Sequence, residues 1–163
     1  PEDRREAGEL LDDIRPYRSL VDDGLRGIMM AHIRYPEIDA DIASFSSYWM
    51  NDVVRGELAF NGAIFSDDLS MAGAEVGRSP GERAALALSG GADMALVCND
   101  REAVSSILDT LDASPPIASQ ARLAAMRCNR QRYAEAEYGS SAWEALRASI
   151  EQAQTVPDLR LDG

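Results

Sequence analysis

The sequence predicts an α/β fold in which three buried parallel strands alternate with amphipathic helices. Short apolar runs at residues 26–31, 62–66 and 92–98 carry this prediction, because strands buried on both faces form nearly continuous apolar runs. The runs begin roughly 30 to 36 residues apart, about the length of a strand, helix, strand unit. A capped amphipathic stretch follows each run, as expected for parallel strands joined by helices.

The first part of the chain predicts two helices around the first strand. Leu10, Leu11 and Ile14 lie at helical spacing upstream of that strand, and we expect their helix to break or restart at Pro16. After the strand, Ser46 is a suitable N-cap for an amphipathic helix. The apolar positions of that helix are Trp49, Met50, Val53, Val54 and Leu58.

The second and third strands each precede a helix with a clear start signal. Ser79-Pro80-Gly81-Glu82 supplies an N-cap, a proline at the first helical position and a capping-box glutamate. Asn99 and Asp100 precede the next amphipathic helix, and the simplest interpretation of this pair is a helix cap. Beyond Pro115-Pro116 we expect C-terminal helices without further strands, the last with a stripe of Trp143, Leu146 and Ile150.

Composition excludes several functional classes. With 28 acidic and 16 basic residues, the chain has a net charge of −12, which repels nucleic acid and anionic membranes. All the basic residues other than the lone histidine are arginine. The absence of lysine excludes Schiff-base chemistry and a P-loop.

No cofactor or metal site is expected from the cysteines. Cys98 and Cys128 form no CxxC pair, and with one histidine they cannot make a usual zinc site. We interpret them as thiols in a reducing compartment. The sequence contains no apolar stretch long enough for a bilayer and starts with Pro1 rather than Met, so we expect a native start upstream. Length and composition indicate a single domain over residues 1–163.

Polar residues follow each predicted strand at the edge where α/β proteins place their sites. His32 follows the first strand, Asp67 and Asp68 the second, and Asn99-Asp100 the third. By themselves, the two aspartates fit a helix cap or surface turn as well as a catalytic pair. His32 by itself fits a packed core or hinge residue better than a catalytic one.

Longer motifs in the chain resemble a known enzyme family. They are Met30-Ala31-His32-Ile33-Arg34-Tyr35-Pro36, Arg55-Gly56-Glu57-Leu58, Phe60 to Met71 with its core FSDDLSM, and Gly90 to Asn99 with its ADM element. In order and spacing, this set resembles the C-terminal part of the β-N-acetylglucosaminidases of glycoside hydrolase family 3, the NagZ type. The resemblance runs from about Asp3 to at least Ala148.

The resemblance implies the last portion of a TIM-type (β/α)8 barrel and a retaining glycosidase. Such an enzyme removes terminal N-acetylglucosamine from peptidoglycan fragments, is cytoplasmic in its compact form and needs no cofactor. Asp67 matches the family's nucleophile, with Asp68 as a supporting residue and Met71 near the pocket wall. His32 matches a family histidine other than the acid/base, so we expect it to support the pocket.

The departures from the family pattern concern the other half of its active site. The family's acid/base histidine and its sugar-binding residues precede the segment with which this chain opens. We therefore expect residues 1–163 to be a partial catalytic domain that lacks the N-terminal barrel half, is inactive alone and self-associates through its open barrel edge. The alternatives are a non-catalytic half-barrel that serves in assembly, and a receiver-type domain with a phosphoacceptor aspartate or bound Mg²⁺. The missing lysine argues against the receiver.

Overall fold

The computed structural model describes residues 1–74, 77–111, 114–127 and 139–153. The chain divides into two compact units, Pro1–Met126 and Arg127–Gly163. In chain order, the first unit contains α1 (Ala7–Asp22), β1 (Gly27–Met30), β2 (Arg34–Tyr35), β3 (Asp39–Ile42), the 3₁₀-helix η1 (Ala43–Phe45), the π-helix η2 (Tyr48–Glu57), β4 (Ala63–Asp68), the 3₁₀-helix η3 (Ala72–Ala74), α2 (Pro80–Gly90), β5 (Met94–Leu96), α3 (Arg101–Thr110) and α4 (Ile117–Ala125). The second contains α6 (Ser141–Ala153), the helix predicted from the last apolar stripe.

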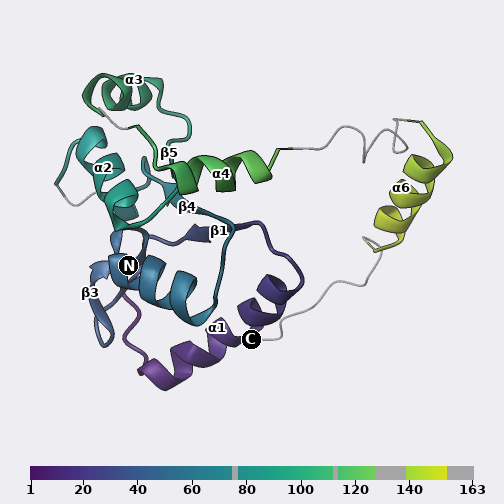
Figure 1. Ribbon diagram of the computed structural model, residues 1–163, viewed down its shortest axis with the longest axis horizontal. Helices are drawn as coiled ribbons and strands as arrows, with labels where there is room; N and C mark the ends of the chain where they lie inside the picture. The colour runs from purple at the N-terminus through teal and green to yellow at the C-terminus, as the bar shows by residue number, and fades with distance from the viewer. Residues whose placement is uncertain (75–76, 112–113, 128–138, 154–163) are drawn as a thin grey trace, which may run out of the picture. The chain divides into compact units, whose positions relative to one another are not determined.

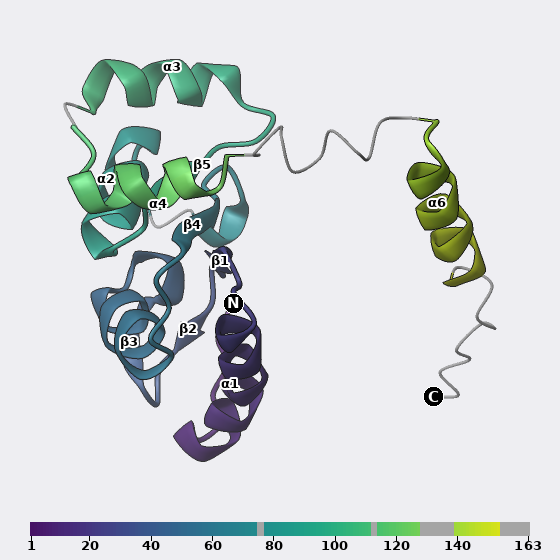
Figure 2. The ribbon, with the colours of Figure 1, turned by 45° about the vertical axis from the view of Figure 1, so that its right-hand side comes forward.

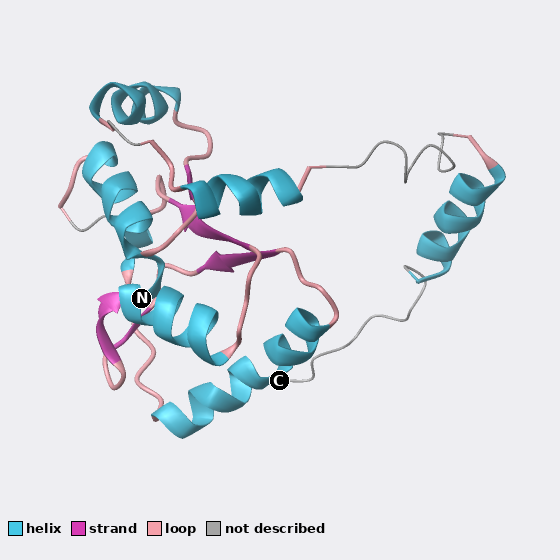
Figure 3. Cartoon of the chain, viewed as in Figure 1, coloured by secondary structure: helices cyan, strands magenta, loops and turns pink. Residues whose placement is uncertain are grey.

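The three predicted strands form one parallel sheet in the order β1-β4-β5, which confirms the α/β prediction (Figure 3). Gly27 pairs with Ala63, and Met30 with Ser66. Strand β4 is thus central, and within the described chain β1 and β5 form the two edges. The carboxyl ends of all three strands lie along one edge of the sheet.

Helices cover one face of this sheet. Ile28 and Ile64 contribute to a buried cluster that also contains residues of η2 and α2, and α3 packs against α2 (Figures 1 and 2). The cluster contains Ile28, Met30, Ala43, Trp49, Met50, Val53, Val54, Phe60, Ile64, Leu69, Ala74, Ala84, Ala87 and Ala92. The alternation of the strands sends Met29, Phe65 and Met94 to the other side, where they are cross-strand neighbours. Met29 remains 57% exposed there.

The predicted starts of α2 and α3 are confirmed in detail, whereas η2 begins at Tyr48 with Ser47 rather than Ser46 as its N-cap. The Ser79 hydroxyl accepts the Glu82 amide, and the Glu82 carboxylate accepts the Ser79 amide, which completes the capping box of α2. Gly91 ends α2 with a φ of 125°, a value that L side chains rarely adopt. The Asp100 carboxylate accepts the Ala103 amide and caps α3.

Two expectations were wrong or incomplete. Helix α1 runs through Pro16 without a break. Pro16 is exposed, so the carbonyl that it leaves unpaired in the preceding turn stays open to water. The antiparallel pair β2-β3 was not predicted, because a two-residue strand is too short to show an alternating pattern. No helix in the described parts of the chain is both long and apolar enough to span a membrane.

Candidate active site

The carboxyl edge of the sheet brings three of the predicted site residues together. His32 lies two residues beyond β1, while Asp67 and Asp68 are the last residues of β4. The His32 Nε2 atom lies 2.9 Å from the carbonyl oxygen of Asp68. The expectation that His32 and Asp67 share one edge of the sheet therefore matches the geometry.

A β-bulge sets the direction of Asp67. Phe65 pairs with Met94 and Asp68 with Leu96, so four residues of β4 lie opposite three of β5. The Ser66 hydroxyl occupies the gap in the ladder, accepting the Leu96 amide at 2.9 Å and donating to the Asp67 carbonyl at 2.8 Å. Bulges of this kind redirect a side chain at a sheet end. The backbone of Asp67 is therefore held within a hydrogen-bonded strand rather than in a loop.

The Asp67 carboxylate is held at one oxygen. Its Oδ1 accepts the Asp68 amide at 2.8 Å, and its side chain is half-buried. Among the described residues it has no ion pair, and Oδ2 has no hydrogen bond. A carboxylate with one fixed and one free oxygen is suited to attack an electrophilic carbon.

Asp68 ties the turn after β4 to the segment after β5. Its carboxylate accepts the Ser70 amide at 2.9 Å, the Ser70 hydroxyl at 2.8 Å and the Cys98 amide at 2.9 Å. Burial by itself would raise the pKa of Asp68, but these hydrogen bonds together hold that pKa below its usual value. Asp68 is thus an ionised anchor that holds these two segments together.

His32 is buried, with 4% of its surface exposed, and both ring nitrogens have partners. Nδ1 lies 2.6 Å from the Ser44 hydroxyl, and Nε2 faces the Asp68 carbonyl. A carbonyl oxygen can only accept, so Nε2 carries the proton. In the neutral ring Nδ1 then accepts from Ser44. This arrangement supports the backbone next to Asp67.

The other predicted residues of this edge lie further out. Met71 is 47% exposed and follows Asp68 in the tight turn, where its amide donates to the Asp68 carbonyl at 3.0 Å. Asn99 has a φ of 62° just before the cap of α3. Cys98 is an exposed free thiol, and Cys128 lies outside the described residues. The described parts of the chain hold no group of three metal-ligating side chains.

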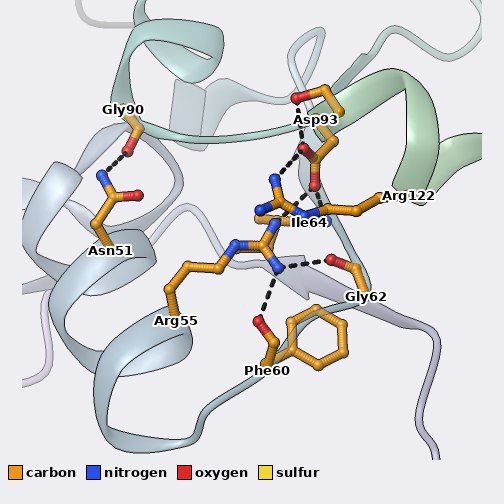
Figure 4. A network of polar contacts seen from close by, with 9 residues as sticks. Asn51, Arg55, Phe60, Gly62, Ile64, Gly90, Asp93 and Arg122 are labelled. Carbon is orange, nitrogen blue, oxygen red and sulfur yellow. Dashed lines mark hydrogen bonds and ion pairs between the residues drawn. The ribbon is translucent and has the colours of Figure 1, made fainter. Parts of the chain in front are cut away.

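A second polar cluster lies at the opposite, amino edge of the sheet (Figure 4). At its centre, the buried Asp93 carboxylate accepts from Arg55 at 2.7 Å, Arg122 at 3.0 Å, Ser119 at 2.6 Å and the Ile64 amide at 2.8 Å. Sequence reasoning did not find this cluster. The signal available was a lone aspartate at the start of an apolar strand, where only a paired carboxylate is tolerated.

Most of the chain matches a known protein family. Residues 2–126 match the glycosyl hydrolase family 3 N terminal domain. A beta-hexosaminidase of Thioalkalivibrio sulfidiphilus is 44% identical over 162 residues, which is 99% of this chain and 47% of that protein. A beta-hexosaminidase of Methylococcus capsulatus is 49% identical over 148 residues, or 88% of this chain and 43% of that protein.

Solved structures give the same result. NagZ from Neisseria gonorrhoeae in complex with zinc ion matches with a TM-score of 0.78 and 31% identity over 91% of this chain and 43% of that one. The same protein in complex with N-trifluoroacetyl-D-glucosamine matches with a TM-score of 0.77 and 31% identity, over 92% and 43%. The chain therefore spans less than half the length of the relatives and structures named here.

Proposed function

The chain belongs to glycosyl hydrolase family 3, and from this membership we propose that it carries the nucleophile half of a retaining β-N-acetylglucosaminidase site. The observation that carries the proposal is the bulge of β4, which holds Asp67 at the carboxyl edge, where its Oδ2 accepts no hydrogen bond from any described residue. Rigid strand ends are where barrel enzymes place catalytic side chains.

In the proposed reaction, Asp67 Oδ2 attacks the anomeric carbon of a terminal β-linked N-acetylglucosamine. The carbon–oxygen bond to the leaving group breaks as the bond to Asp67 forms, and an acid protonates the departing oxygen. Water then attacks the same carbon, a base takes its proton, and the Asp67 carboxylate is released. Two inversions give net retention of configuration.

The acid/base of this reaction is proposed to come from protein upstream of the chain. His32 does not fit that role, since both of its nitrogens are engaged and its ring is buried. Asp68 does not fit either, because hydrogen bonds hold it ionised. A general acid must carry a proton and reach the leaving oxygen.

We propose terminal N-acetylglucosamine of peptidoglycan fragments as the substrate, and the cytoplasm as the location. The complex of NagZ with an N-acylated glucosamine supports a sugar of this class. The exposed, unpaired Cys98 thiol fits a reducing compartment. Both the proposed substrate and the proposed location fit a role in peptidoglycan recycling.

Self-association of the isolated chain is a further part of the proposal. The edges of β1 and β5, which are unpaired within the described residues, and the apolar row of Met29, Phe65 and Met94, in which Met29 and Met94 are exposed, support it, because unpaired strand edges recruit other chains. The non-catalytic half-barrel is the second candidate function, and the same exposed face favours it. The two candidate functions are distinguished by whether a substitution of Asp67 lowers turnover.

The test compares Asp67→Asn with Asp68→Asn in the upstream-extended enzyme, using hydrolysis of an aryl N-acetyl-β-glucosaminide. Asparagine keeps the shape of Asp67 but cannot form the glycosyl ester, so turnover should fall to near background while the fold persists. Asp68→Asn should cost less, because it loosens a turn without removing the reacting atom. Equal losses at both positions would refute this assignment of roles.

A further inference from the structure

Two buried side chains bind successive carbonyl groups directly after Asp67. His32 Nε2 donates to the Asp68 carbonyl at 2.9 Å, and Arg83 Nη1 donates to the Leu69 carbonyl at 2.6 Å. The donors come from different parts of the chain, His32 from the segment after β1 and Arg83 from the first turn of α2. Both are more than nine-tenths buried.

The amides of the same turn are also bonded. The Leu69 amide donates to the Leu96 carbonyl at 2.8 Å, and the Ser70 amide donates to the Asp68 carboxylate at 2.9 Å. The peptide groups Asp68–Leu69 and Leu69–Ser70 are thus each held by a hydrogen bond at the carbonyl and another at the amide. Rotation of either plane would break a buried hydrogen bond, which is costly without water to replace it.

Packing around the two donors indicates that they are placed for this purpose. The Ser44 hydroxyl is fully buried and fixes the far side of the His32 ring. A Cβ at Gly73 would lie 3.1 Å from the His32 Cβ, so the chain passes close to the base of the His32 side chain. The Arg83 Nε has no hydrogen-bond partner in the described structure. The guanidinium is therefore buried with the Leu69 carbonyl as its one described acceptor.

We propose that His32 and Arg83 are positioning residues that hold the turn following β4 and so fix the direction of Asp67. This inference rests on the proposed role of Asp67 as nucleophile. Neither residue touches the reacting atoms. Their effect is on alignment, and a displacement of about 1 Å at a reacting group can cost roughly 10²-fold in rate.

The first arm of the test uses the 163-residue chain and needs no activity. Because His32 is the only histidine, its ring nitrogens can be assigned unambiguously by long-range ¹H–¹⁵N NMR. We expect the tautomer protonated at Nε2. A tautomer protonated at Nδ1 would overturn the inference, since Nε2 would have no proton to donate.

Amide hydrogen exchange in the same chain measures the order of the turn. His32→Ala and Arg83→Met should each speed exchange at Leu69 and Ser70 by about tenfold or more, relative to the amides of β1 and β4. His32→Gln and Arg83→Lys retain a donor and should restore most of the protection. Arg18→Met is the matched control, because Arg18 also donates to a carbonyl, that of Glu57, on an exposed surface. Unchanged exchange in both donor-free variants would overturn the inference.

The second arm measures kcat and KM in the upstream-extended enzyme. His32→Ala should lower kcat about 10- to 100-fold with KM little changed, and His32→Gln should recover most of the loss. Val53→Ala, a core truncation in η2, measures how far a general loss of stability lowers kcat. A fall in kcat no larger than that of Val53→Ala would overturn the positioning role. Full activity of Asp67→Asn would instead remove the proposed function, while the exchange result in the turn would stand.

Discussion

Removing the Asp93 carboxylate should produce the largest loss of stability among single polar substitutions in the sheet. The side chain is 1% exposed and accepts hydrogen bonds from Arg55, Arg122, Ser119 and the Ile64 amide. Asp93→Ala leaves these donors facing an apolar gap. Breaking a buried ion pair by removing one partner costs about 3–5 kcal/mol. A domain with a stability of roughly 5–15 kcal/mol would lose a large part of it.

Asp93→Asn removes the negative charge of the side chain but keeps its size and shape. One carboxylate oxygen becomes an NH₂ group that faces donors, and each buried donor left without an acceptor costs about 1–3 kcal/mol. Arg55 has further acceptors in the Phe60 and Gly62 carbonyls and stacks over the Phe60 ring. We therefore expect Asp93→Asn to cost less than Asp93→Ala.

The pH dependence of stability gives an independent measure. Burial by itself would raise the pKa of Asp93, but hydrogen bonds from Ser119, Ile64 and Arg122, with the charge of Arg55, lower it. Because the pKa of Asp93 is lower in the folded state, its carboxylate stabilises the fold at pH values above the unfolded-state pKa of about 3.9. This contribution is lost as the pH falls through the folded-state pKa. Below about pH 4 the wild type should therefore lose stability faster than Asp93→Asn.

Urea unfolding followed by far-ultraviolet circular dichroism, at pH 7 and at steps down to about pH 3, tests both expectations. Asp12→Ala is the control, since Asp12 forms an exposed ion pair with Arg15 and should change little. A midpoint for Asp93→Ala close to that of Asp12→Ala would refute the reasoning. So would parallel pH profiles for wild type and Asp93→Asn.

Three further predictions concern the isolated chain and two local features. The 163-residue chain should hydrolyse an aryl N-acetyl-β-glucosaminide at or near background, because the loss of general acid catalysis alone costs about 10²- to 10⁴-fold; robust turnover by a monomer in the same sample would contradict this. Gly62→Ala should cost about 1–3 kcal/mol in urea unfolding, since its Cβ would collide with the Arg26 carbonyl and the Phe60 ring. Ser79→Ala should cost about 0.5–2 kcal/mol through loss of the α2 cap, whereas Ser105→Ala on the exposed side of α3 should not.

Features with a local cause could be predicted from the sequence. The strands follow from apolar runs, and the starts of α2 and α3 follow from Ser79, Glu82 and Asp100, whose hydrogen bonds reach only three residues along the chain. The carboxyl-edge position of His32 and Asp67 follows from strand direction alone. Their roles in catalysis came from the resemblance and remain proposals.

Features with a distant cause could not be predicted. The bulge that directs Asp67 depends on Met94 and Leu96, nearly 30 residues away. The partners of Asp93 come from η2, β4 and α4. The continuity of α1 depends on Pro16 being on the exposed side. None of these relations leaves a periodic or short-range pattern in the sequence.

The two edges of the sheet use carboxylates in opposite ways. At the amino edge, Asp93 is saturated by donors from three directions and binds β4 to β5 through reciprocal bonds with Ile64. At the carboxyl edge, Asp68 accepts hydrogen bonds from Ser70 and Cys98, whereas the adjacent Asp67 accepts only the Asp68 amide at Oδ1, and its Oδ2 has no partner within the described structure. A carboxylate that accepts several fixed donors stabilises the fold and is a weaker nucleophile, because each hydrogen bond draws on its lone pairs. The contrast between adjacent aspartates is therefore the strongest physical argument for assigning the chemistry to Asp67 and the support to Asp68.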